Sequence, residues 1–189
     1  VRAYSTCLRG QLSSNVRQHK RSRMRATAVK DAPIELEPYN AQWPELFQLE
    51  AASLREVLNP WLAGAIEHIG STSVPGLSAK PVIDIMAPVH SLELATPAID
   101  ALPALGYCYF PYKAEVMHWF CKPSPAHRTH HLHLVAAGSG TWLERIAFRN
   151  ALRGSAQLAA EYLSLKQRLA SDHARDREAY TEGKSLFIQ

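Results

Sequence analysis

The sequence predicts a single α/β or α+β domain in which a mixed sheet of about four or five strands is flanked by helices. Short runs rich in Val and Ile, of the length expected for strands, alternate with longer segments of helical periodicity. The chain has no internal repeat, and no long linker follows residue 31. A length of 189 residues with 47% apolar residues is enough for one sizeable core.

The first predicted element is an amphipathic helix within residues 37–60. Pro44 stands early, where a helix tolerates proline, and Asn59-Pro60 ends the segment. Apolar side chains recur between these limits at intervals of three and four residues: Trp43, Phe47, Ala51, Leu54 and Leu58.

The remaining elements follow in order along the chain. Residues 65–69 and 81–89 read as buried strands, and residues 91–106 read as a helix that Pro97 and Pro103 interrupt. Further strands are predicted at 107–112 and 117–122, as a hairpin, and at 130–136. Helices are predicted at 141–154 and 155–176, separated by Gly154-Ser155. We expect the strands 65–69, 81–89 and 130–136 to be adjacent at the centre of the sheet.

The first 30 residues differ in composition from the rest. They carry eight of the 21 Lys and Arg residues and no Asp or Glu, so the body carries 13 basic and 17 acidic groups. An Arg- and Ser-rich leader without acids is typical of an organelle transit peptide, and a disordered basic arm is the alternative. A chloroplast or mitochondrial location follows from the first interpretation, and a cytoplasmic one from the second. Residues 31–189 are expected to form the functional domain.

Several classes of protein are disfavoured by composition. No apolar stretch approaches membrane-spanning length. Cys7, Cys108 and Cys121 form no C-x-x-C pair, which argues against a zinc ribbon or a disulfide framework. The body lacks a basic stripe with interleaved aromatics, so nucleic-acid binding is not expected. The oligomeric state is left open.

Polar residues stand where the two strands 65–69 and 81–89 meet their connection. Gly70-Ser71 ends the first strand, and Asp84 lies inside the apolar second strand, where an unpaired charge is costly. A turn with little side-chain bulk can present backbone N–H groups to phosphate, and a carboxylate opposite can hold the accompanying Mg²⁺. The alternative is a tight turn in which Asp84 pairs with an arginine, or with Lys80 on the same face.

Histidines form a second cluster in "THHLHLV", where His131 and His133 share one strand face. Two imidazoles spaced in this way can bind one metal, or they can bond to solvent or to Asp84. A third cluster is cationic and either clamps phosphate or forms a solvated face: Lys80, Arg145, Arg149 and Lys184.

The stretch "IEHIGSTSVPGLSAKPVIDI" resembles the signature of the GrpB-like family, and "PYNAQWPELFQLE", "THHLHLV" and "YTEGKSLFI" extend the resemblance across residues 34–189. The resemblance implies the fold of the nucleotidyltransferase superfamily, and a context near coenzyme A metabolism, because family members occur fused to dephospho-CoA kinase. The superfamily pattern places Gly70, Ser71 and Asp84 at the site. Met86 stands where that pattern has its second carboxylate.

Two functions are compatible with these residues. The first is metal-dependent transfer of a nucleotidyl group from an NTP to an undefined acceptor. In it, Asp84 and Lys80 are catalytic, and Asp84, His131 and His133 hold Mg²⁺ or Mn²⁺. The phosphates are then bound by the remaining candidates: Gly70, Ser71, Thr72, Ser73, Arg145, Arg149 and Lys184. The second is a catalytically impaired module that binds a nucleotide or a phosphorylated small molecule in the same pocket.

Overall fold

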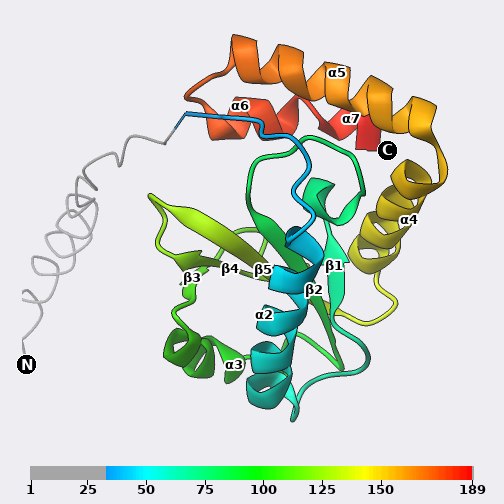
Figure 1. Ribbon diagram of the computed structural model, residues 1–189. Coiled ribbons are helices and arrows are strands. Elements are labelled where there is room, and N and C mark those ends of the chain that lie inside the picture. The colour runs from blue at the N-terminus through cyan, green and yellow to red at the C-terminus, as the bar shows by residue number, and fades with distance from the viewer. Residues whose placement is uncertain (1–32, 189) are drawn as a thin grey trace, which may run out of the picture. The chain divides into compact units, whose positions relative to one another are not determined.

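A computed structural model describes residues 33–188, and the predicted basic leader lies outside the described residues. The described chain contains a five-stranded sheet in the order β1-β2-β5-β4-β3 (Figure 1). The central strands β2 (Ile83–Val89) and β5 (Arg128–Ala136) are parallel. All other neighbours are antiparallel, so the sheet is mixed as predicted.

Both edges of the sheet are short strands. β1 (Glu67–Ile69) and β3 (Cys108–Phe110) have three residues each, and β3 forms a hairpin with β4 (His118–Pro123). The three strands expected to be adjacent do lie side by side. The expectation that all three are central was wrong, because β1 is an edge strand that begins two residues later than predicted.

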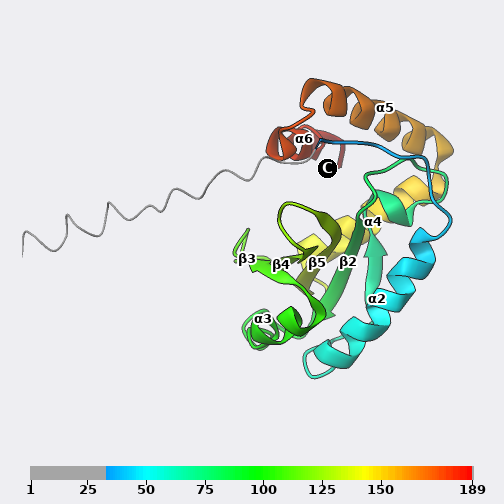
Figure 2. The same ribbon diagram turned by 60° about the vertical axis from the view of Figure 1, so that its left-hand side comes forward.

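One face of the sheet packs against α2 (Trp43–Leu58), which has Pro44 in its first turn and buries the five residues of the predicted apolar stripe. The same layer contains α3 (Ala98–Ala101) and the 3-10 turn η2 (Leu102–Leu105) (Figure 2). The predicted helix over 91–106 is thus reduced to two short pieces. Pro97 and Pro103 lack the N–H that a continuous helix would need.

The opposite face is covered in part by α4 (Gly140–Gly154), whose Trp142 and Ile146 pack on Ile69, Met86 and Val135. The serines at the starts of α4 and of α5 (Ala156–Asp172) each accept a main-chain hydrogen bond from the residue three positions on. Two short helices that the sequence did not predict follow: α6 (Arg177–Glu182) and α7 (Ser185–Ile188).

The three C-terminal helices lie over the end of the sheet where residues 70–82 connect β1 to β2 (Figure 1). Val74 and Leu77 of this connection are buried with Leu152 and Tyr162 from α4 and α5. Ile34 is buried with Leu169 and Tyr180. No described helix has the length and apolar content needed to span a bilayer.

Candidate functional site

The site is built on a row of residues that crosses the sheet. Asp84 of β2 stands opposite His131 of β5, which in turn stands opposite Cys121 of β4. Register partners project to the same face. This face is the one that α4 covers further along the strands, where Met86 and Val135 are buried.

Asp84 and His131 are hydrogen-bonded, with 2.9 Å between Nδ1 of the ring and Oδ1 of the carboxylate. Because an ionised carboxylate only accepts, Nδ1 carries the proton. Nε2 of His131 is buried without a partner in the described part of the chain. Burial by itself raises the pKa of Asp84, but the His131 hydrogen bond and the charges of His131, His133 and Arg145 lower it to about 2. Asp84 is therefore an ionised group in the folded protein at neutral pH.

Gly70 brings the main chain directly against Asp84. A Cβ added at Gly70 would lie 2.4 Å from Oδ2 of Asp84, and φ of Gly70 is +70° with ψ of −175°, a region open almost only to glycine. The predicted meeting of the Gly70 turn with Asp84 is thus present in the structure.

The hydroxyls that follow Gly70 have partners within the protein. Thr72 donates to the carbonyl of Val82 at 3.1 Å and contacts Nε2 of His68 at 3.0 Å. Ser73 donates to the carbonyl of Gly70 at 2.6 Å. The hydroxyls of Thr72 and Ser73 are both buried and hold the turn η1 (Ser71–Ser73).

The three predicted metal ligands share one face but do not converge. His133 is buried, and its Nδ1 lies 3.4 Å from the sulfur of Met117. Burial, and then the charge of Arg145, lower the pKa of His133 well below its ordinary value. Within the described residues, no three His, Cys, Asp or Glu side chains gather in a metal-binding group. A metal at Asp84 would have to share the carboxylate with His131.

The predicted cations separate into two groups. Arg149 lies on the β1 side, where Nη1 donates to Glu67 at 2.6 Å and to the carbonyl of His68 at 3.0 Å. Lys80, Arg145 and Lys184 instead lie within electrostatic range of Asp84. Lys80 forms no ion pair with Asp84 in the described chain, so the alternative pairing of these two residues was wrong.

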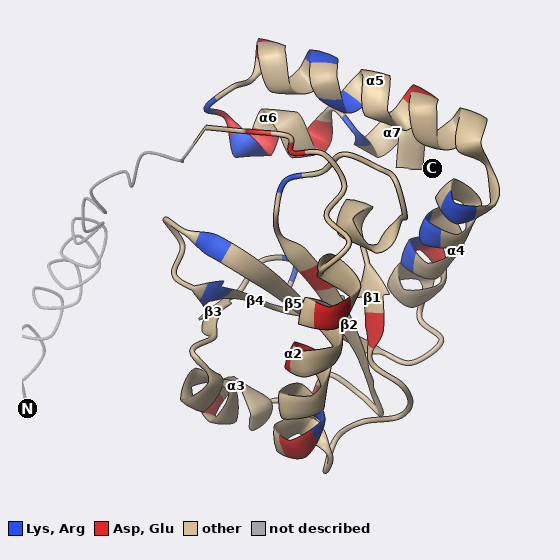
Figure 3. Ribbon diagram, viewed as in Figure 1, with Lys and Arg blue, Asp and Glu red and all other residues tan. Residues whose placement is uncertain are grey.

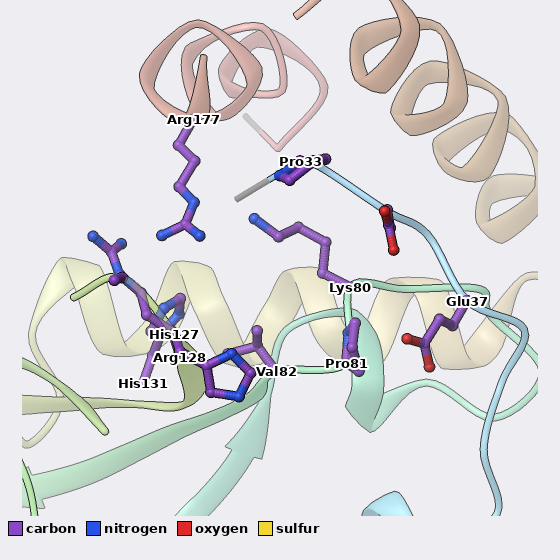
Figure 4. A pocket seen from close by; sticks show the side chains of 11 residues that line it. Pro33, Glu37, Lys80, Pro81, Val82, His127, Arg128, His131 and Arg177 are labelled. Carbon is purple, nitrogen blue, oxygen red and sulfur yellow. The ribbon is translucent and has the colours of Figure 1, made fainter. Parts of the chain in front are cut away.

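A pocket of about 210 Å³ opens beside this row, and its lining is rich in cations. Figure 4 shows Arg177 of α6, Lys80 and Arg128 extending into the same region near His131. Nε of Arg128 lies 3.0 Å and Nη1 of Arg177 3.4 Å from the carbonyl oxygen of Pro125, so two guanidinium groups share one acceptor.

The pocket cations affect one another. Burial, and then the charges of Arg177 and Lys184, lower the pKa of Lys80 to about 8. Lys184 is stacked over the Tyr180 ring at 4.3 Å, and burial lowers its pKa. Glu35 and Glu37 also line the pocket, and they belong to an acidic stretch that leads into α2 (Figure 3).

Arg128 and Arg177 were missed by the sequence analysis. Arg128 immediately precedes the motif "THHLHLV", and its place at the start of β5 could have indicated it. Arg177 lies in a six-residue helix with no clear sequence pattern.

The fold and this site define a GrpB-type domain. The GrpB protein family matches residues 33–189, so the chain belongs to the GrpB family, which falls within the nucleotidyltransferase-like superfamily. The crystal structure of conserved protein GrpB from Enterococcus faecalis is similar, with a TM-score of 0.74 and 34% identity over 82% of this chain and 92% of that one.

Two sequence relatives add context. UPF0157 protein YqkA of Bacillus subtilis is 33% identical over 156 residues, which are 82% of this chain and 45% of YqkA. The chain therefore spans about half the length of that relative. A dephospho-CoA kinase of Mycobacterium tuberculosis is 35% identical over 82 residues, which are 42% of this chain and 20% of the kinase.

Proposed function

We propose that this domain binds a phosphorylated small molecule, with a phosphate group held by Lys80, Arg128 and Arg177. The observation that carries the proposal is the gathering of these cations around one pocket. Cations held together at a partly buried site repel one another: after burial, which is the largest cause, the charges of Arg177 and Lys184 lower the pKa of Lys80 further. A dianionic phosphate relieves this repulsion, and guanidinium groups match its geometry.

The size of the pocket favours a particular arrangement of the ligand. A volume of about 210 Å³ is smaller than a typical site for a complete drug-sized ligand. We therefore place the phosphate end in the pocket and the remainder of the molecule outside it. The likeness of part of this chain to a dephospho-CoA kinase makes nucleotides of the coenzyme A type reasonable first candidates.

The site has one carboxylate, Asp84, where two-metal transfer needs at least two, and this favours binding over transfer. Met86 is fully buried at the position of the second carboxylate, beneath Trp142 and Ile146. A pair of bridged metal ions needs more carboxylate oxygens than Asp84 offers.

Nucleotidyl transfer is the second candidate, and one observation favours it. Gly70 and Asp84, two residues of the superfamily pattern, lie against each other, because a Cβ at Gly70 would lie 2.4 Å from Oδ2 of Asp84. A single Mg²⁺ or Mn²⁺ at Asp84 would be held through Oδ2, because Oδ1 accepts from Nδ1 of His131 and Nε2 lies on the far side of that ring.

A thermal-shift and calorimetric panel tests the proposal. We expect pyrophosphate, ADP, dephospho-CoA and coenzyme A to raise the Tm, and adenosine and pantetheine to leave it unchanged. Arg128→Met should weaken binding of the best ligand about tenfold or more, by loss of a charged hydrogen-bonding partner. The matched control, Arg168→Met on the exposed side of α5, should not alter it. Equal binding of phosphorylated and unphosphorylated ligands would exclude the phosphate site.

The second candidate has its own readout. Metal-dependent release of pyrophosphate from NTPs, abolished in Asp84→Asn, would indicate nucleotidyl transfer in addition to binding. Binding without pyrophosphate release, across a panel of hydroxyl and phosphate acceptors, is the result expected of a binding module.

A further inference from the structure

The two described cysteines face each other across the β3–β4 hairpin. Cys108 is the register partner of Cys121, and both are free thiols. The next pair along the hairpin, Tyr109 and Phe120, has ring centroids 5.2 Å apart. Since neighbouring pairs project to alternate faces, the two sulfurs project together from the other face, on which Asp84 and His131 also lie.

The spacing of such a pair is close to that of a disulfide. Directly opposed residues of antiparallel strands have Cα atoms about 4.5–5.5 Å apart, and disulfides join Cα atoms about 4.4–6.8 Å apart. Opposed Cβ atoms lie about 4.5–5.5 Å apart and those of a disulfide about 3.5–4.5 Å apart, so the Cβ atoms must approach by about 1 Å. β3 has three residues and a single neighbouring strand, so it can make this adjustment without disturbing the centre of the sheet.

The two thiols differ in their access to reagents. Cys121 is fully buried, and burial raises its pKa. Cys108 is half-buried, and its sulfur lies 3.7 Å from the carbonyl oxygen of Pro123. A dissolved reagent therefore reaches Cys108 first, and Cys121 can react only with a sulfur that is already at Cys108.

We propose that Cys108 and Cys121 are a reversible redox site, which forms a cross-strand disulfide by exchange with a low-molecular-weight disulfide such as oxidised glutathione. The Cys108 thiolate attacks one sulfur of the reagent, a Cys108 mixed disulfide forms, and one glutathione thiolate leaves. Cys121 then attacks the Cys108 sulfur and expels the second glutathione, and the protons of the two cysteines end on the two released thiols. Two cysteine thiols are oxidised, and one glutathione disulfide is reduced to two thiols.

The cysteine pair lies next to the pocket, but its oxidation does not require a ligand there. Cys121 is the register partner of His131, and the charge of Arg128 acts on the Cys121 thiol. Both of these residues line the pocket. The two cysteines meet within the hairpin itself, so the disulfide can form whether or not a phosphate binds in the pocket.

The test uses the full chain in a Cys7→Ser background, so that only the two hairpin cysteines remain. This protein is equilibrated with glutathione buffers of increasing oxidation, and it is then acid-quenched, alkylated and analysed by intact mass and peptide mapping. We expect an intramolecular Cys108–Cys121 bond, with loss of about two mass units as two hydrogens leave, which thiol reductants reverse fully.

Two further variants test the order of attack. With Cys121→Ser, we expect one glutathionyl group to accumulate on Cys108; with Cys108→Ser, we expect Cys121 to stay unmodified while the protein is folded. The proposal is overturned if the parent keeps two free thiols in the most oxidising buffer, or if Cys121 takes up glutathione as fast as Cys108. The measurement on the parent needs neither hairpin substitution, so a variant that fails to fold does not affect the result.

Discussion

At the scale of single residues, Gly70 and Asp84 depend on each other. Gly70 permits the main chain to pass where a Cβ would overlap the carboxylate, and its dihedral angles are open almost only to glycine. The carboxylate in turn is fixed by His131. The connection between β1 and β2 therefore has little freedom at its first residue.

Gly70→Ala should lower the free energy of unfolding by about 3 kcal/mol, as the sum of backbone strain and the displacement of Asp84. Gly138→Ala is the matched control, because φ of Gly138 is +71° but nothing lies within 4 Å of its added Cβ. Gly138→Ala should lower the free energy of unfolding by only about 1–2 kcal/mol, because alanine is strained in the left-handed backbone conformation. Urea unfolding measures both, and equal losses would show that the contact with Asp84 is unimportant.

Asp84 should make stability depend on pH below 4. Its pKa falls from an ordinary 3.8 to about 2 on folding, so its contribution is complete above pH 3.8 and is lost as the pH falls through 2. The contribution amounts to about 2 kcal/mol. In Asp84→Asn, the free energy of unfolding should therefore fall by about 2 kcal/mol less between pH 5 and pH 2 than it does in the wild type. Asp100→Asn, an exposed position on α3, should keep the pH dependence of the wild type. Parallel curves for all three proteins would count against the His131 pairing.

The sequence was informative about this pair because strand alternation has a period of two. Asp84 and His131 could each be assigned to a face, and the glycine before Ser71 indicated a close approach of the backbone. Arg128 and Arg177 could not be assigned to a site in this way. Their convergence on the Pro125 carbonyl depends on how α6 lies against the start of β5. The two arginines are 49 positions apart in the chain, so no local sequence pattern encodes that contact.

At the scale of elements, α4 is joined to the edge strand β1 by a charged contact. Arg149 donates to Glu67 and to the His68 carbonyl, and the side chain of Asn150 accepts from its Nε at 3.1 Å. The sequence placed Arg149 among the phosphate ligands because helical spacing sets it beside Arg145. Spacing alone could not show that Glu67 lies in front of it.

Arg149→Met should lower the free energy of unfolding by about 2 kcal/mol, because it leaves Glu67 and a buried carbonyl unpaired. The affinity for the phosphorylated ligand should not change, in contrast to Arg128→Met. Chemical unfolding and calorimetry on the two variants separate the roles. A loss of affinity at unchanged stability in Arg149→Met would restore this residue to the phosphate site.

Helix and strand boundaries were predictable to different degrees. The stripe of α2 was identified residue by residue, because five buried positions at intervals of three and four specify one helical face. α6 and α7 have six and four residues, too short for any periodicity to be read. Tyr180 of α6 packs with Ile34 and Leu169, and Phe187 of α7 packs against a different cluster that includes Val74 and Tyr162. These contacts come from other parts of the chain.

At the scale of the whole molecule, the segment that precedes α2 belongs to the domain. The N–H of Ile34 donates to the carbonyl of Ala174 at 2.8 Å, and Glu37 forms two main-chain bonds of 2.9 Å with Ala79. Glu35 and Glu37 also line the pocket. A domain boundary near residue 31 keeps these contacts, whereas a boundary at the start of α2 removes them.

A chain starting at Asp31 should unfold as cooperatively as the full chain and bind the same ligand. A chain starting at Pro38 should lose about 2 kcal/mol or more, from the exposed Ile34 site and the lost bridge to Ala79. It should also bind the ligand more weakly, since one wall of the pocket is gone. Thermal unfolding followed by circular dichroism compares the three proteins. Indistinguishable melting of the two truncated chains would mean that residues 33–37 contribute nothing to the fold.

The pocket draws its walls from the beginning, the middle and the end of the described chain, through Glu35, Lys80 and Arg177. A bound phosphate would thus act as a non-covalent cross-link between segments that are remote in sequence. Local opening of either end would have to break contacts with the same anion. Ligand should therefore slow amide hydrogen exchange near Ile34 and in α6 together and by a similar factor, even though these regions are separated by more than 140 positions in the chain.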